Sequence, residues 1–238
     1  MKSETKSKLE DADLYDREYF DDHYAYDPLR ERMYDQEYRR FMGMKPSFPD
    51  TFEGRVLDVG CGVGNFLERF KEHGWKCYGV EPSEYARNQC KNKWIVVYED
   101  ISKLKDESFD VVIFRGTLQH IARPIQALDE ATRVLKVGGE LVILATPNSE
   151  GLVYKIWRNL PALDAPRNWI IFGESELRNI LHRLGYVNLR SVFPYWGTPY
   201  AHPVRDLFKF VVSLFFGYRK FAFPKSMMEI YAIKGDIK

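Results

Sequence analysis

The sequence predicts an α/β protein in which a mostly parallel sheet is covered by helices on both faces. Three observations predict this fold. From Gly54 onward, short apolar runs alternate with helical segments, which is typical of a parallel sheet buried on both faces. The first run leads into a glycine-rich stretch, as happens when a strand turns directly into a helix. The 238 residues are 45% hydrophobic, enough for one principal domain with a full core.

Seven strands are expected, five in the α/β segment and two near the carboxyl end. Apolar residues at helical spacing predict helices between most of them, one ending before Gly138 and another at Gly185. A further helix is predicted over 28–42, after Pro28. The predicted strands are 55–59, 76–80, 94–98, 110–114, 140–145, 187–193 and 227–234.

Composition divides the chain into an arm, a core and a tail. Residues 1–50 carry 13 acidic and 9 basic side chains, a net charge of −4, and six of the fifteen tyrosines. From residue 186 onward, 8 basic and 3 acidic side chains give a net charge of +5. We therefore expect an N-terminal helical arm over 1–50 and one domain over 51–238, with an aromatic insertion at about 195–225 before the last strand.

Charge and cysteine content limit the possible functions. The net charge of +1 argues against a broad basic face, so no nucleic acid partner is expected. Three cysteines without a CxxC pair indicate neither a disulfide framework nor a zinc module, and no metal is expected. The polar amino terminus shows no leader segment, which favours a cytoplasmic location. The longest apolar stretch, 210–218, is too short to span a bilayer.

The strongest motif is a buried strand that runs through Asp58 into Gly60, Gly62 and Gly64 and then into an amphipathic helix. Glycine is needed where a ligand lies against a backbone with positive φ. The spacing is GxGxG, whereas a dinucleotide fingerprint reads GxGxxG, so a pyrophosphate ligand is disfavoured. Glu81 follows the next strand, where a carboxylate would accept both hydroxyls of a ribose. The pattern favours a nucleoside ligand.

Each of these residues also has a structural alternative. The glycines could form a tight turn alone, and Glu81 could cap the helix that begins after Pro82 and Ser83. A non-catalytic cofactor-binding module and a nicotinamide-dependent oxidoreductase therefore remain open as functions.

Together the motifs over about 50–150 resemble the class I S-adenosylmethionine-dependent methyltransferases. The stretches 109–115 and 133–139 resemble further motifs of that family, in the family's order. The resemblance implies a Rossmann-like three-layer sandwich, seven strands with the last antiparallel, S-adenosyl-L-methionine as cofactor, and methyl transfer. It implies that Asp100 takes the adenine amine and Ile101 packs on the ring. The residues expected to hold the cofactor are Asp58, Gly60, Gly62, Gly64, Glu81, Pro82, Asp100, Ile101, Arg115 and Tyr19.

The residues after the fourth strand are the place to look for the methyl acceptor, because ligands bind outside the carboxyl ends of parallel strands. His120 is the candidate general base, with the alternative that it only packs near the cofactor. Gln119 could line the substrate cleft. Arg115 could contact the cofactor or substrate, or pair with an acid.

The stretch 16–24 resembles the lid of ubiquinone-pathway and glycan-tailoring methyltransferases. Tyr15, Tyr19 and Tyr24 would then contact the cofactor, or merely pack on the core. Asn148 and Trp169 resemble acceptor-pocket residues of that subgroup, although relatives often have a histidine where this chain has Asn168.

The expected reaction is therefore O-methylation of a sugar or glycoconjugate. The alternatives are a quinone-type or other small-molecule acceptor, or no catalysis. The aromatic insertion could close the acceptor pocket, form a homodimer seam, or make peripheral membrane contact.

Overall fold

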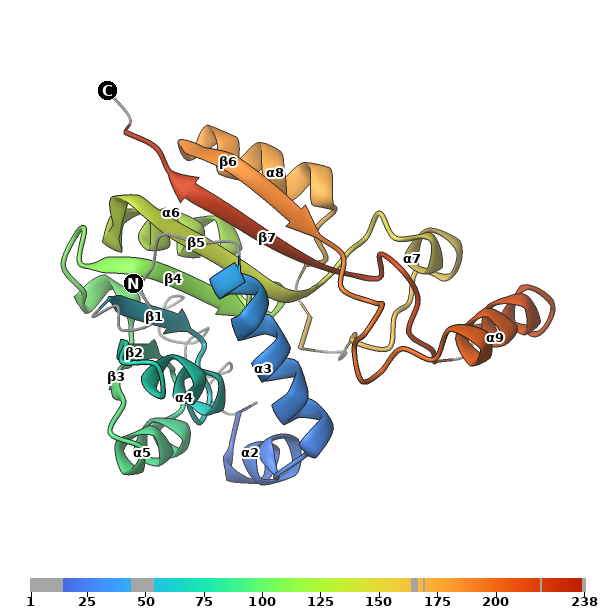
Figure 1. Ribbon diagram of the computed structural model, residues 1–238, viewed down its shortest axis with the longest axis horizontal. Coiled ribbons are helices and arrows are strands. Elements are labelled where there is room, and N and C mark those ends of the chain that lie inside the picture. Colours follow the sequence, from blue (N-terminus) through green and yellow to red (C-terminus); the bar gives the residue numbers. More distant parts are fainter. Residues whose placement is uncertain (1–14, 44–53, 164–166, 169, 219, 237–238) are drawn as a thin grey trace, which may run out of the picture.

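The computed structural model describes residues 15–43, 54–163, 167–168, 170–218 and 220–236. Its seven strands form one sheet in the order β3-β2-β1-β4-β5-β7-β6 (Figure 1). Strands β1 to β5 pair in parallel, and β7 runs antiparallel between β5 and β6. The predicted fold class is therefore confirmed. The strands are β1 Arg55–Val59, β2 Lys76–Val80, β3 Val96–Tyr98, β4 Phe109–Arg115, β5 Leu135–Pro147, β6 Tyr186–Val192 and β7 Met227–Lys234.

The fifth strand departs most from the prediction. It begins at Leu135, directly after α6 (Pro124–Val134), whereas the glycine pair at 138–139 had suggested a stop. Gly138 adopts a φ of +75°, and the pairing with β4 shifts register between Phe109 and Val111. The glycines therefore lie in an irregular part of the strand and do not precede it.

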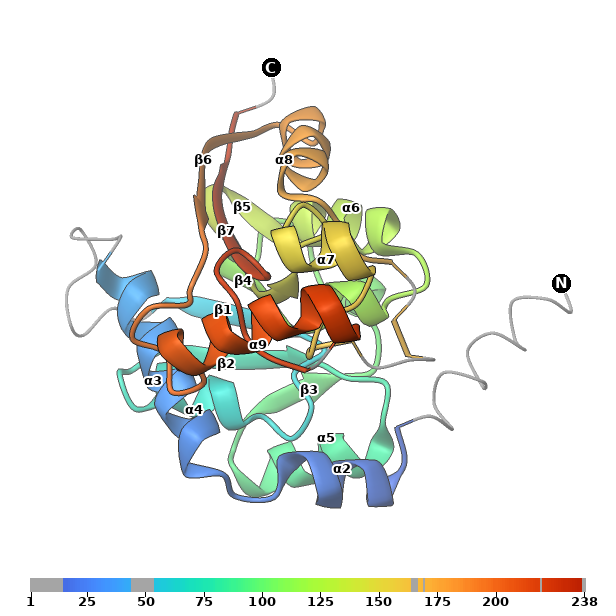
Figure 2. The same cartoon turned by 90° about the vertical axis from the view of Figure 1, so that its right-hand side faces the viewer.

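Helices cover both faces of the sheet and make a three-layer sandwich (Figures 1 and 2). On one face, α6 and α8 (Glu174–Arg183) pack on a core that includes Leu57, Val112 and Ile143. On the other face, α3 (Pro28–Gly43) and α4 (Asn65–Lys71) pack on Val111 and Val142. The helix α5 (Glu84–Asn92), between β2 and β3, lies beside β3.

The described part of the N-terminal arm contains α2 (Arg17–Tyr24) and α3, and α3 is part of the core. Tyr34, Tyr38 and Phe41 are at most 4% exposed. The Tyr38 ring lies 4.9 Å from that of Phe70, in an edge-to-face contact. Removing the arm would uncover this apolar surface and destabilise the fold. Substitutions within α2 therefore test whether the arm forms a lid over the cofactor better than deletion of the arm would.

The segment between β6 and β7 contains the helix α9 (Pro203–Phe216), which projects to one side (Figure 1). Its inner side packs against α7 (Leu152–Trp157), with the Trp157 and Phe210 rings 5.6 Å apart. Asp206 is fully buried at the start of α9, where it accepts hydrogen bonds from the Tyr195 hydroxyl and the His202 amide. Among the described residues, no helix is long and apolar enough to cross a bilayer.

Candidate functional site

The three glycines after β1 all adopt positive φ angles, of 78°, 54° and 80°. A Cβ on Gly60 would lie 2.2 Å from Cγ2 of Thr117, and one on Gly62 would lie 2.8 Å from the Tyr24 hydroxyl. Gly64 precedes the first residue of α4 and packs near Cys90 and Ile95. Backbone conformation and space therefore both require glycine here.

Glu81 follows β2 and is 5% exposed. Its carboxylate accepts one hydrogen bond from the Gly62 amide at 3.0 Å and one from the Ser83 amide at 2.9 Å. Burial raises the pKa of this carboxyl group. Ser83, and not Glu81, accepts the capping bond from α5, so the alternative of a helix-capping acid does not describe Glu81. Because a carboxylate has about four acceptor positions, two remain for ligand hydroxyls.

Asp58 lies in β1 and is 2% exposed. Its Oδ1 atom is buried without a hydrogen-bond partner among the described residues. Burial raises the pKa of Asp58 to about 7, against the opposing effect of the Arg115 charge. An orphaned buried carboxylate oxygen fits a cationic or hydrogen-bond-donating ligand group, which would satisfy it.

A first cavity of about 320 Å³ lies at the carboxyl ends of the strands. This volume is within the range of small-molecule sites. Four aromatic side chains of the arm also line it, namely Tyr15, Tyr19, Phe20 and Tyr24. Asp58, Gly62 and Gly64 are not part of its wall. The predicted cofactor and catalytic residues that it brings together are Tyr19, Gly60, Glu81, Pro82, Asp100, Ile101, Arg115 and His120.

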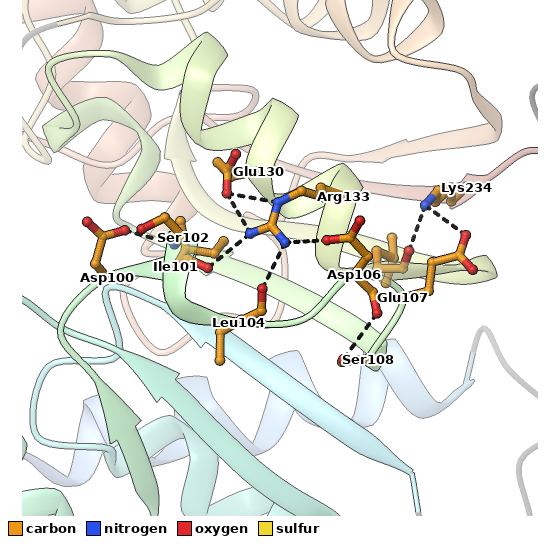
Figure 3. A network of polar contacts seen from close by, with 11 residues as sticks. Asp100, Ile101, Ser102, Leu104, Asp106, Glu107, Ser108, Glu130, Arg133 and Lys234 are labelled. Carbon is orange, nitrogen blue, oxygen red and sulfur yellow. Dashed lines mark hydrogen bonds and ion pairs between the residues drawn. The ribbon is translucent and has the colours of Figure 1, made fainter.

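The turn that carries Asp100 and Ile101 is fixed by a network of polar contacts centred on Arg133 (Figure 3). The Arg133 guanidinium donates to the carbonyl oxygens of Ile101 and Leu104, at 3.2 and 2.8 Å, and forms ion pairs with Asp106 and Glu130. Asp100 accepts a bond from the Ser102 amide at 2.8 Å. The motif that begins with Arg133, in the last turn of α6, thus holds the turn of Asp100 and Ile101 in place, which the sequence pattern did not reveal.

Arg115, at the end of β4, pairs with Glu37 of α3. Nε of Arg115 lies 2.6 Å from Oε2 of Glu37, and its guanidinium lies over the Tyr34 ring at 4.3 Å. Glu37 is 1% exposed, and its burial raises the pKa of this carboxyl group. The expected pairing of Arg115 with an acid is therefore present. Glu37 was not anticipated, because a polar residue in an acidic arm carries no local signal of burial.

His120 lines the first cavity and its Nδ1 atom lies 3.0 Å from the carbonyl oxygen of Arg167. A carbonyl can only accept, so Nδ1 carries the proton and the neutral ring keeps Nε2 as its acceptor nitrogen. This arrangement is suitable for a general base. The Arg167 guanidinium in turn lies 4.8 Å from the Tyr19 ring, which connects this loop to the arm.

The other expected substrate residues lie elsewhere. Gln119 is 4% exposed and donates to the Gly116 carbonyl at 2.9 Å. Asn148 is 2% exposed, donates to the Lys225 carbonyl and accepts from the Glu150 amide, so its amide braces the chain before β7. Neither lines the first cavity. Trp169 lies outside the described residues, and its role stays a prediction.

Comparison with known proteins gives several similar curated relatives. The tRNA U34 carboxymethyltransferase of Helicobacter acinonychis is 30% identical over 153 residues, which cover 53% of this chain and 58% of that protein. The protein of the same name from Idiomarina loihiensis is 29% identical over 177 residues, which cover 66% and 54%. The chain thus spans little more than half the length of these relatives.

These relatives correct the expectation that nucleic acid is excluded as a partner. Their name describes action on tRNA, so the small net charge of this chain does not support the exclusion. The physical reason is that net charge is a sum over the chain. The −4 of residues 1–50 cancels most of the +5 that follows residue 186, whereas binding depends on local charge.

Solved structures share the fold at lower identity. A methyltransferase from Thermotoga maritima, described as a possible histamine N-methyltransferase, has a TM-score of 0.57 at 24% identity and covers 87% of this chain and 98% of its own. One from Archaeoglobus fulgidus has a TM-score of 0.60 at 20% identity and covers 91% and 98%. These similarities show the fold alone.

The family described as Methyltransferase domain matches residues 14–191, which include the glycine loop, Glu81, Asp100 and His120. The first cavity, the conformation of the three glycines after β1 and the buried Asp58 oxygen without a hydrogen-bond partner among the described residues fit the cofactor of that family. The chain therefore belongs to the class I S-adenosylmethionine-dependent methyltransferases.

Proposed function

We propose that this enzyme transfers the methyl group of S-adenosylmethionine to a hydroxyl oxygen of a sugar or glycoconjugate, as the glycan-tailoring enzymes that its motifs resemble do. The observation that carries the proposal is the orientation of His120. A sugar hydroxyl has a high pKa and benefits from a base, and His120 lines the first cavity with its ring oriented by the contact between Nδ1 and the Arg167 carbonyl oxygen.

The chain's residues have distinct tasks in this proposal. When bound, S-adenosylmethionine supplies an electrophilic methyl group. Asp58 accepts donor groups of its methionyl part, Glu81 accepts the ribose hydroxyls, and Asp100 and Ile101 hold the adenine. His120 takes the proton of the acceptor hydroxyl as its oxygen attacks. Alignment of the oxygen with the methyl group and exclusion of water supply most of the rate.

We infer that the arm is a lid over the cofactor. Tyr19, Phe20 and Tyr24 line the first cavity, and Phe20 is 4% exposed. The test is Tyr19→Ala, with Tyr26→Ala as the matched control because Tyr26 is 82% exposed. We expect Tyr19→Ala to weaken S-adenosylhomocysteine binding in calorimetry and Tyr26→Ala to leave it unchanged. Equal affinities in both variants would exclude the lid.

The reaction is tested by release of S-adenosylhomocysteine with sugar nucleotides and methyl glycosides as acceptors. His120→Ala should lower turnover by about 10²- to 10⁴-fold, the usual effect of a general base, with cofactor affinity retained. His182→Ala, at the exposed end of α8, is the control. Wild-type turnover in His120→Ala would remove the base assignment, and no release with any sugar acceptor would reject the sugar proposal.

A second candidate acceptor is a nucleoside in RNA. It is favoured by the name of the curated relatives and by the net charge of +5 from residue 186 onward. The test is methyl transfer from S-adenosylmethionine to unmodified tRNA at two salt concentrations. An RNA substrate should bind less tightly at higher salt because phosphate contacts release counterions. A reaction rate independent of added tRNA would reject this candidate.

A further inference from the structure

A second cavity, of about 420 Å³, shares Arg115 with the first. Its wall comes from α3, from Ala145 near the end of β5, and from the chain on both sides of α9. It therefore lies next to the carboxyl ends of β4 and β5, and Arg115 borders both cavities. None of its wall residues was among the predicted site residues except Arg115.

One residue in the wall of the second cavity carries a polar atom that makes no hydrogen bond with the described residues. Ser226 is 4% exposed and lines the cavity, and its Oγ atom is buried without a hydrogen-bond partner among the described residues. Its backbone is held on both sides, since its amide donates to the Phe223 carbonyl and its own carbonyl accepts from Asn148. A buried hydroxyl without a hydrogen-bond partner lowers the stability of the fold unless a ligand completes its hydrogen bonds.

Two buried carboxylates, Glu37 and Glu229, line the same cavity. Glu37 accepts two bonds from Arg115. Glu229 accepts two from Arg40 and one from the Tyr231 hydroxyl at 2.8 Å. With about four acceptor positions on each carboxylate, two remain on Glu37 and one on Glu229. Each carboxylate is neutralised by its arginine, so the cavity suits an uncharged ligand that donates several hydrogen bonds.

The remaining wall is largely apolar and aromatic. Met33, Tyr195, Tyr200 and Phe223 contribute to it. Flat aromatic and thioether surfaces suit the C–H face of a pyranose ring, whereas a quinone offers carbonyl acceptors and no donors. A bound quinone would leave the remaining acceptor positions of the buried carboxylates unpaired, so the cavity discriminates strongly against a quinone ligand.

We propose that the second cavity binds the sugar ring of the methyl acceptor. Ring hydroxyls donate to Glu37 and Glu229, and another ring hydroxyl forms a hydrogen bond with the Ser226 hydroxyl. The proposal rests on the proposed sugar methyltransferase function and names its acceptor site. Arg115 borders both cavities, so the hydroxyl to be methylated lies on the Arg115 side of the ring, toward the first cavity and His120.

The test measures binding of methyl hexopyranosides, UDP-hexoses, uridine and a benzoquinone to the full chain saturated with S-adenosylhomocysteine. We expect a hexopyranoside or UDP-hexose to bind and the quinone not to bind. Ser226→Ala should weaken the sugar affinity about 3- to 10-fold, the range for one neutral hydrogen bond, without lowering the unfolding temperature, because the hydroxyl makes no bond within the fold. Unchanged sugar affinity in Ser226→Ala would overturn the assignment.

A second variant tests the cavity without relying on one hydroxyl. Ala222→Phe places a ring in the wall and should abolish sugar binding while S-adenosylhomocysteine binding persists. Ala201→Phe, which is outside the cavity wall, is the control. Methylation of a sugar with normal KM in both Ser226→Ala and Ala222→Phe would refute this site and leave the proposed function intact. Sugar binding that both variants weaken, without methyl transfer, would keep the site and refute the function. No binding of any sugar probe, or preferred binding of uridine or the quinone, would overturn the site.

Discussion

The pKa of Asp58 predicts a pH-dependent stability that one substitution should remove. The side chain is 2% exposed with one orphaned oxygen, and burial raises its pKa to about 7. An Asp in an unfolded chain has a pKa of about 3.9. Between these two values the folded state holds a proton that the unfolded state has lost. The stability of the protein without ligand therefore falls as the pH rises from about 4 to about 7.

The size of the effect follows from the difference of about 3 pKa units. At 1.36 kcal/mol per unit, Asp58 destabilises the fold by about 4 kcal/mol above pH 8. Roughly 2 to 3 kcal/mol of this develops between pH 5 and pH 8, because the unfolded state is already partly ionised at pH 5. Asp58→Asn keeps the shape of the side chain and cannot ionise, so it should lose this dependence.

Urea unfolding of wild-type and Asp58→Asn protein at pH 5, 6.5 and 8 measures the difference. From pH 5 to pH 8, we expect the free energy of unfolding of Asp58→Asn to rise by about 2 to 3 kcal/mol relative to that of the wild type. Asp129→Asn, an exposed position on α6, controls for the loss of one negative charge. If the difference between wild type and Asp58→Asn stays constant from pH 5 to pH 8, the reasoning from burial is refuted.

Three further substitutions test the framework of the site. Glu37→Gln leaves the Arg115 charge buried without its partner and should cost about 3 to 5 kcal/mol, seen in calorimetry as a fall of about 6 to 20 °C in Tm; an unchanged Tm contradicts this. Arg133→Met should loosen the turn of Asp100 and Ile101 and weaken S-adenosylhomocysteine binding, measured by titration, whereas wild-type affinity would exclude the bracing role. Gly60→Ala should abolish cofactor binding in the same titration, since its Cβ would overlap Thr117; retained binding would show that the loop can move.

Much of the framework could be predicted from local sequence. Strands β1, β2 and β7 begin and end where the apolar runs predicted, because each is a short run bounded by polar or turn-forming residues. The glycine loop was recognised because positive φ angles and close approach restrict the residue type directly. Residues that follow successive strands, such as Glu81 and His120, meet in one cavity because parallel strands end at the same edge.

The sequence by itself thus determined the sheet and the glycine loop, because these depend on patterns only a few residues long. The tertiary structure alone decided how Arg115 is neutralised and what forms the second cavity. Glu37 lies 78 positions from Arg115, and Glu229 lies 189 positions from Arg40. Charge pairs of this kind arise where α3 crosses the sheet, and only packing determines which acidic side chains become buried there and which remain in solvent.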